Sequence, residues 1–397
     1  MASLRITRLL FLFSLFFSSE FGFLRRASAL GINYGQVANN LPAPGDVVTL
    51  LSSLGISKTR IYDMNPQVLT AFANSGIEII VTVPNDAVGQ LTNPQQALQW
   101  VTANIKPYVP ATKITGISVG NEIYSTGDEA LTSSLVPAMA AIHQALSRYG
   151  LDSTIHVSSA SSLAVLQNSY PPSLGAFEPE LASTIAPFLR FLAETNSPFW
   201  INAYPYFAYK DDPTSIPLDY VLANPNSGMV DPYTKLHYDN MLYAQVDAVV
   251  VAMSRLGYAG VEVRVSETGW PSKGDENEYG ATVENARAYN RNLLVRQLKD
   301  EGTPLRPNQG LEVYLFALFN EDMKPGPASE RNYGLYQPDM TMAYNVGLAA
   351  TSKTTSTASV STIFSSSAKA YKLELGNLLS CLVVLSLTLQ VLMTRAL

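Results

Sequence analysis

Short apolar runs recur along residues 30–347, and longer segments with a different spacing separate them. Runs of this length that are rich in Val, Ile, Phe and Tyr are typical of buried β-strands. Eight such runs are predicted strands, at residues 31–34, 59–62, 77–83, 114–119, 154–157, 199–203, 261–265 and 313–319.

The segments between these runs show helical spacing. Leu242, Val246 and Met253, for example, fall on one side of a predicted helix, and Gly257 supplies its stop signal. Strands that alternate with helices pair in parallel, so eight such units predict an α/β fold, a closed (β/α)8 TIM barrel. An open doubly wound sheet is the alternative, but the chain lacks a glycine-rich phosphate loop after its first strand.

The connection after the sixth strand, residues 205–235, is rich in Pro, Asn, Asp and Tyr. It is longer than an ordinary loop between a strand and a helix. We expect it to form a small subdomain over one side of the active-site face.

The seventh predicted strand leads into a carboxylate. Val261, Val263 and Val265 alternate with polar residues, and Glu267 follows just before a Gly-Trp-Pro sequence. A carboxylate at the C-terminal end of a barrel strand has a rigid backbone beneath it. Trp270 would place an aromatic wall beside it for a sugar ring. The structural alternative for Glu267 is a salt-bridged carboxylate that caps the next element.

A second carboxylate, Glu122, follows the fourth predicted strand. Parallel strands present their C-terminal ends at the same face of a barrel, so Glu122 and Glu267 should project from that face. Hydrolysis of a glycosidic bond with retention needs two carboxyl groups about 5 to 5.5 Å apart. The sequence therefore predicts a pair of catalytic carboxylates, although Glu122 alone could equally cap a helix.

Six sequence blocks occur in order along the chain: GINYG (31–35), RIYD (60–63), VGNE (119–122), INAYPYF (201–207), SETGWPS (266–272) and FALFNEDMKPGP (316–327). Together these blocks resemble glycoside hydrolase family seventeen, the family of the plant β-1,3-glucanases and related mixed-linkage glucanases. Arg264, in the seventh predicted strand, departs from the apolar residue that the family leads us to expect.

The resemblance implies a TIM barrel and a retaining mechanism, with Glu267 as nucleophile and Glu122 as general acid and then general base. It implies that Glu321 and Lys324 form a charged pair that steadies the site, against the alternative of a surface salt bridge of little worth. Further side chains that end predicted strands are candidates for binding sugar or orienting the nucleophile, unless they are core or capping residues; they are Tyr62, Asn121, Asn202 and Tyr204.

The expected activity is endo-hydrolysis of β-1,3-glucan of the callose or laminarin type. Mixed-linkage β-1,3-1,4-glucan is an alternative substrate, and glucan transglycosylation is an alternative reaction through the same glycosyl-enzyme. A wall protein that binds glucan without cleaving it would use the same cleft, but it would not need both Glu122 and Glu267.

Residues 116–120 (GISVG) also match the nucleophile elbow of serine hydrolases. Ser118 would then follow a strand and precede a helix, but it falls within the predicted strand. The partner would have to be His143, His156 or His237, which are dispersed along the chain. No metal-binding cluster is visible, and we expect no cofactor.

The two ends of the chain carry processing signals. Residues 1–29 combine arginines, a short apolar run and small residues just before an expected cleavage site, a pattern that predicts a secretory signal peptide. Residues 348–367 are a predicted Ser/Thr-rich linker, and residues 368–397 a propeptide removed when a glycosylphosphatidylinositol (GPI) anchor is attached. A C-terminal transmembrane helix is the alternative. Cys381 lies in this tail, so the mature chain would hold no cysteine.

The charge changes with these cuts. The whole chain carries −6, residues 1–29 carry +3 and residues 368–397 carry +2, so removing both leaves −11. An acidic protein is repelled by nucleic acid and by anionic wall polymers. We therefore expect no nucleic-acid partner, and a monomer held by its anchor at the outer face of the plasma membrane or cell wall.

Overall fold

The structure is a computed structural model that describes residues 30–348. The predicted signal peptide, the anchor propeptide with Cys381 and all but the first residue of the predicted linker lie outside these residues. Within residues 30–348, none of the helices combines the length and apolar character that crossing a membrane requires.

Eight parallel strands close into a barrel in the order β1-β12-β11-β8-β5-β4-β3-β2, which confirms the predicted TIM barrel and excludes the open doubly wound sheet. Each of the eight predicted runs overlaps one barrel strand. The barrel strands are β1 (Leu30–Asn33), β2 (Lys58–Arg60), β3 (Glu78–Val83), β4 (Lys113–Asn121), β5 (His156–Ser162), β8 (Phe199–Asn202), β11 (Val263–Thr268) and β12 (Val313–Leu315).

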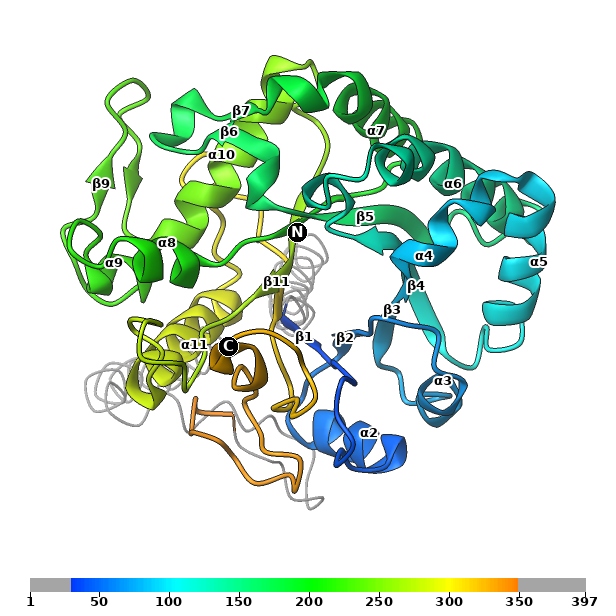
Figure 1. The fold of residues 1–397 in the computed structure, drawn as a ribbon, viewed down its shortest axis with the longest axis horizontal. Helices are drawn as coiled ribbons and strands as arrows, with labels where there is room; N and C mark the ends of the chain where they lie inside the picture. The colour runs from blue at the N-terminus through cyan, green and yellow to red at the C-terminus, as the bar shows by residue number, and fades with distance from the viewer. Residues whose placement is uncertain (1–29, 349–397) are drawn as a thin grey trace, which may run out of the picture. The chain divides into compact units, whose positions relative to one another are not determined.

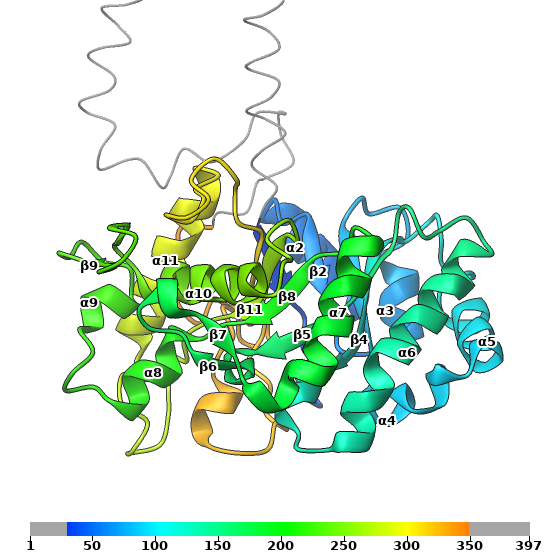
Figure 2. The ribbon, with the colours of Figure 1, turned by 90° about the horizontal axis from the view of Figure 1, so that it is seen from above.

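Helices surround the barrel, as Figures 1 and 2 show. The predicted helix near Leu242 is α10, where Asn240 accepts a hydrogen bond from Tyr243 N at the N-terminus and Gly257 has a positive φ beyond the C-terminus. The helices around the barrel are α2 (Pro44–Ser53), α3 (Pro66–Ala71), α4 (Asn85–Val88), α5 (Pro94–Asn104), α6 (Glu129–Ser147), α7 (Ala182–Glu194), α10 (Met241–Arg255) and α11 (Val283–Leu298).

Strand β5 lies later in the sequence than predicted. The prediction covered residues 154–157, whereas the strand runs from His156 to Ser162. Its second half is SSASS, a polar sequence that gives no hydrophobic signal. One of these buried serines has an acceptor, since Ser158 Oγ donates a hydrogen bond of 2.7 Å to Pro198 O.

A layer of large side chains fills the middle of the barrel. Trp200 and Tyr314 pack with Ile80 and Ala160 in one buried cluster. Gly31 makes room for one ring, because a Cβ there would lie 2.3 Å from Tyr314 Cδ1. The interior is therefore a packed core, and any site must lie at one end of the strands.

The N-terminal ends of the strands carry a layer of ion pairs, which we call the charged floor; it consists of Lys58, Glu78, Lys113, Arg264 and Glu312. Lys113 Nζ lies 2.8 Å from Glu78, and Arg264 Nη1 lies 3.3 Å from Glu312, which also pairs with Lys58. Arg264, the departure from the family pattern, thus has acidic partners in this layer.

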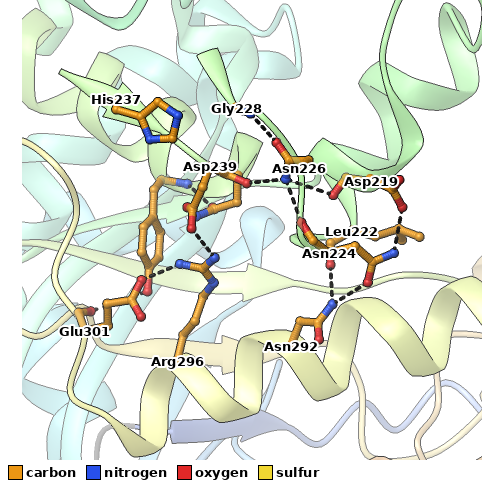
Figure 3. Close-up of polar contacts among 12 residues, drawn as sticks. Asp219, Leu222, Asn224, Asn226, Gly228, His237, Asp239, Asn292, Arg296 and Glu301 are labelled. Carbon is orange, nitrogen blue, oxygen red and sulfur yellow. Dashed lines mark hydrogen bonds and ion pairs between the residues drawn. The ribbon is translucent and has the colours of Figure 1, made fainter. Parts of the chain in front are cut away.

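The connection after β8 contains α8 (Pro205–Asp211), α9 (Leu218–Val221) and the antiparallel strands β9 (Met229–Val230) and β10 (His237–Tyr238). Figure 3 shows how helix α11 fastens it: Asn292 Nδ2 donates to Leu222 O, and Arg296 pairs with Asp239 at 2.6 Å. This segment belongs to the same compact unit as the barrel, and its status as a separate subdomain stays a prediction.

The remaining short elements lie in loops. Strands β6 (Leu166–Asn168) and β7 (Ala176–Phe177) pair antiparallel after β5. Single turns of 3-10 helix are η1 (Gln90–Thr92), η2 (Ile123–Ser125), η3 (Leu163–Val165), η4 (Pro172–Leu174), η5 (Pro179–Leu181) and η6 (Ala328–Arg331).

Candidate active site

Both candidate carboxylates lie at the C-terminal ends of barrel strands. Glu122 follows the last residue of β4, as predicted. Glu267 is the penultimate residue of β11, so it lies within the strand, whereas we expected it just after the strand's end. Asn202, at the end of β8, pairs in register with Glu267, and its Nδ2 donates a 2.7 Å hydrogen bond to Glu122 Oε1. The amide of Asn202 thus links the two strand ends.

The backbone of Glu122 has an unusual conformation. Its φ of 53° and ψ of 34° fall in the left-handed region, which costs free energy for a residue with a side chain. The Asn85 side chain holds the backbone of the preceding residue, since its Oδ1 accepts from Asn121 N at 2.8 Å and its Nδ2 donates to Asn121 O at 3.1 Å. The first residue of α4, just beyond β3, therefore supports the turn that aims Glu122.

The surroundings of Glu122 favour its protonated form. Burial and the negative charge of Glu267 raise the pKa of Glu122, although the N–H of Asn202 and the charge of Arg60 act in the opposite direction. Asn202, which hydrogen-bonds to Glu122 and pairs in register with Glu267, brings the two carboxylates to the same end of the barrel. A carboxyl group kept protonated in this way is suited to act as a general acid.

Glu267 is held in place by two donors. Arg60 Nη1 lies 2.7 Å from Glu267 Oε1, and the hydroxyl of Tyr204 donates to Glu267 Oε2 at 3.0 Å. Glu267 is 6% exposed and Arg60 is fully buried, so water screens this ion pair little. The two donors fix the positions of both carboxylate oxygens, an arrangement suited to a carboxylate that attacks a substrate.

Arg60 is the main site residue that the sequence analysis missed. Its Nη2 also donates to Asn121 Oδ1 at 2.8 Å, so one guanidinium holds both Glu267 and the residue before Glu122. The signal lay in the RIYD block, where a charged residue interrupts a predicted buried strand. Such a residue in a strand needs a buried partner, and Glu267 is that partner.

Aromatic rings surround this ion pair. Tyr62 packs under the guanidinium of Arg60 at 4.7 Å and contacts Phe316 edge to face. Tyr204 contacts both Phe316 and Tyr333 in the same manner. Phe316 and Tyr333 are buried, while Tyr62 and Tyr204 are half-buried, so the two tyrosines are the rings on which the C–H surface of a sugar could stack.

A sequence model described as "Glycosyl hydrolases family 17" matches residues 30–348. This chain belongs to glycosyl hydrolase family 17. Glucan endo-1,3-beta-glucosidase 11 of Arabidopsis thaliana is 52% identical over 324 residues, which cover 81% of this chain and 76% of that protein. Glucan endo-1,3-beta-glucosidase 14 of the same plant is 51% identical, over 81% of this chain and 83% of that protein.

Two solved structures resemble this family 17 chain closely. CJP38, a β-1,3-glucanase and allergen of Cryptomeria japonica pollen, is 43% identical with a TM-score of 0.77 and covers 81% of this chain and 99% of its own. A structure reported among two plant β-glucan endohydrolases with distinct substrate specificities is 40% identical with a TM-score of 0.74, and covers 79% and 99%.

Two expectations about the family 17 site are wrong. Trp270 was predicted to wall the sugar, but it is 0% exposed, packs against Tyr206 and donates its indole N–H to Gly280 O at 2.8 Å. It supports the loop after β11 from beneath. Lys324 was predicted to pair with Glu321, but it pairs with Glu330 at 3.2 Å and lies over the Phe316 ring.

Glu321 is buried and has a different role from the predicted one. Its Oε1 accepts a hydrogen bond of 2.8 Å from Val37 N, which ties the loop after β12 to the loop after β1. Burial raises the pKa of Glu321, and the charge of Lys324 opposes that shift. Its contact is therefore with the backbone of a neighbouring loop.

The serine-hydrolase alternative does not fit this family 17 fold. Ser118 is buried inside β4 and donates to Gly120 O, and His156 pairs in register with Gly116 rather than with Ser118. Among residues 30–348, no group of three or more His, Cys, Asp or Glu side chains is arranged to hold a metal ion.

Proposed function

We propose that this chain is an endo-acting hydrolase that cleaves β-1,3-glucosidic bonds within β-1,3-glucan and retains the anomeric configuration. The observation that carries the proposal is the pairing of a buried, doubly held Glu267 with a Glu122 whose pKa is raised by burial and by that neighbouring charge. The names of its relatives, at about half identity, support β-1,3-glucan as the substrate.

The reaction divides into two displacements. In the first, a Glu267 oxygen attacks the anomeric carbon while Glu122 gives its proton to the departing glycosidic oxygen, leaving a covalent glycosyl-enzyme. In the second, Glu122 takes a proton from a water molecule, whose oxygen attacks the anomeric carbon and displaces Glu267. Arg60 and Tyr204 hold the carboxylate of Glu267 before attack and after release.

Glu122→Gln and Glu267→Gln test these two roles. Each change keeps the shape of the side chain and removes either the transferable proton or the attacking charge, so kcat on laminarin should fall at least about a thousandfold. Circular dichroism and thermal unfolding should show folded proteins. Turnover near the wild-type level in either folded variant would refute the role given to that residue.

Linkage preference needs a direct comparison, because a similar solved structure comes from a pair with distinct substrate specificities. We expect purified protein to release oligosaccharides from laminarin and callose faster than from barley mixed-linkage glucan, and to leave an esterase substrate intact. Faster cleavage of the mixed-linkage glucan would support the alternative substrate. Products longer than the glucan chains supplied as substrate would identify glucan transfer. Binding of glucan without any product would identify a glucan-binding protein.

We further propose that the chain is secreted and attached to the outer leaflet of the plasma membrane. The proposal rests on the signal-like residues 1–29, the linker at 348–367 and the tail at 368–397. Treatment of plant membranes with a phosphatidylinositol-specific phospholipase should release the protein into the soluble fraction. Retention in the membrane after such treatment would support a transmembrane tail instead.

A further inference from the structure

Ser266, the residue directly before the nucleophile, contacts the acid side of the site. Its hydroxyl donates a 2.7 Å hydrogen bond to Asn202 Oδ1. Ser266 is 1% exposed and Asn202 is 2% exposed, so water does not compete for this contact. The other end of the same amide, Nδ2, donates to Glu122 Oε1. A continuous chain of hydrogen bonds therefore runs from β11 through β8 to Glu122.

An asparagine amide has two ends of opposite polarity, and it can bind a carboxyl group with either one. With Nδ2 toward Glu122, the amide donates to Oε1 and keeps a proton off that oxygen. With Oδ1 toward Glu122, the amide would instead accept a proton carried by Oε1. The orientation of Asn202 therefore decides which oxygen of protonated Glu122 bears the proton.

Ser266 favours the first orientation. If the amide turned over, Nδ2 would face the serine, and the Ser266 hydroxyl hydrogen would lose its acceptor in a buried place. Among residues 30–348, the Ser266 hydroxyl hydrogen-bonds to Asn202 alone. A buried donor without an acceptor is costly, so the serine opposes rotation of the amide.

We propose that Ser266 is a positioning residue that fixes the Asn202 amide and so keeps the catalytic proton of Glu122 on Oε2, the oxygen that Asn202 does not bind. This inference rests on the proposed role of Glu122 as acid and base. No partner among residues 30–348 hydrogen-bonds to Oε2, which leaves that oxygen for proton transfer to the substrate.

The test is the pH dependence of kcat/KM for Ser266→Ala on laminarin. Without the serine, the amide turns over and accepts the proton on Oε1, which stabilises protonated Glu122 in an unproductive form. The basic limb of the profile should move to higher pH by about 0.5 to 1 unit, while kcat falls about tenfold. A loss of packing alone would lower kcat and leave the basic limb in place.

Two further variants give matched controls. Ser158→Ala removes another buried serine hydroxyl, which donates to Pro198 O on the same barrel, and should leave the basic limb unmoved. Ser266→Cys keeps much of the volume with a weaker donor and should move the limb in the same direction by a smaller amount. It also preserves the test if Ser266→Ala does not fold.

A double variant checks that the serine acts through the amide. Ser266→Ala combined with Asn202→Ala should show the same basic limb as Asn202→Ala alone, since no amide remains to turn over. An unmoved limb in both folded Ser266 variants, or an equal movement in Ser158→Ala, would overturn the inference. If the Ser266 test fails in this way while Glu122→Gln is inactive, the proposed function still stands. An active Glu122→Gln would remove both the proposed function and the inference about Ser266.

Discussion

Two donors fix the carboxylate of Glu267, and they differ in what they contribute. Arg60 supplies a full positive charge and also reaches Asn121, while Tyr204 supplies one hydroxyl hydrogen bond. Removal of Arg60 would leave a buried carboxylate without its counter-charge, which disturbs folding as well as chemistry. Tyr204 is therefore the cleaner position at which to measure what orientation of the nucleophile is worth.

Tyr204→Phe should lower kcat/KM on laminarin about tenfold to a hundredfold with little loss of stability. The reason is that a hydrogen bond to a charged group contributes about 1.5 to 3 kcal/mol. Tyr206→Phe is the matched control, because the Tyr206 ring packs against Trp270 and, within residues 30–348, its hydroxyl makes no hydrogen bond to Glu267; its kcat/KM should stay near the wild-type value. Equal losses in the two variants would mean that the effect comes from packing.

The raised pKa of Glu122 sets the basic side of the activity profile. Glu122 must be protonated to act as the acid, and burial together with the charge of Glu267 raises its pKa above the ordinary value of 4.5. Activity should therefore persist above pH 4.5 and fall only as the pH rises through the raised pKa. A basic limb of the kcat/KM profile with its midpoint at or below pH 4.5 would contradict this environment for the acid.

The sequence predicted the two carboxylates but misassigned several of their neighbours. Strand ends and the resemblance were enough to locate Glu122 and Glu267. Arg60 was missed because a buried charge is recognisable only with its partner, which lies far along the chain. Trp270 was misread because an aromatic residue beside a catalytic strand can face either the cleft or the core, and its burial is decided by tertiary packing.

At the scale of elements, the site depends on how β4 ends. Gly120 and Glu122 both have positive φ, and a Cβ on Gly120 would lie 2.3 Å from Ile123 Cδ1. On the side of β3, whose pairing with β4 ends at Val119, two hydrogen bonds join the Asn85 side chain to the backbone of Asn121. The loop that begins α4 thus stabilises a costly backbone conformation at the acid.

Asn85→Ala should reduce kcat about tenfold to a hundredfold while KM changes little, because the backbone that aims Glu122 loses two hydrogen bonds of about 1 kcal/mol each. Asn93→Ala is the control. Asn93 caps helix α5 and accepts from Gln95 N and Gln96 N, so its loss should cost about 1 kcal/mol of stability without affecting kcat. A similar loss of kcat in both variants would assign the effect to general destabilisation.

The hydrophobic pattern predicts where strands occur better than it predicts where they end. The existence of all eight strands follows from their apolar runs, yet β5 extends through polar serines that the pattern could not register. Inside a barrel, a serine is acceptable wherever a carbonyl such as Pro198 O lies within reach. That acceptor comes from the segment before β8, so a local window of sequence contains no information about it.

At the scale of the whole molecule, the two ends of the barrel have separate roles. The C-terminal ends of the strands hold the two carboxylates that we propose to be catalytic, and the N-terminal ends hold the charged floor. Glu312 pairs with Lys58 and Arg264, and its side chain is 13% exposed. The floor therefore belongs to stability, which agrees with the division of labour in TIM barrels.

Glu312→Ala should destabilise the fold by about 3 kcal/mol, because two largely buried cations lose a partner. Lys113→Ala removes a floor residue that is 54% exposed and should cost less than about 1 kcal/mol. Denaturant unfolding measures both values. If the two variants prove equally stable, the charged floor contributes no more to stability than surface ion pairs do. The catalytic constants of both variants should match those of the wild type.

Azide rescue of two alanine variants, followed by proton NMR, tests the assignment of the two carboxylates most directly. An activated aryl β-glycoside of a β-1,3-linked disaccharide serves as the substrate. Because azide takes the place of the missing carboxylate, Glu267→Ala should yield the α-glycosyl azide, and Glu122→Ala should form the glycosyl-enzyme and yield the β-glycosyl azide. The reverse pairing of variants and products would contradict the roles given to Glu267 and Glu122.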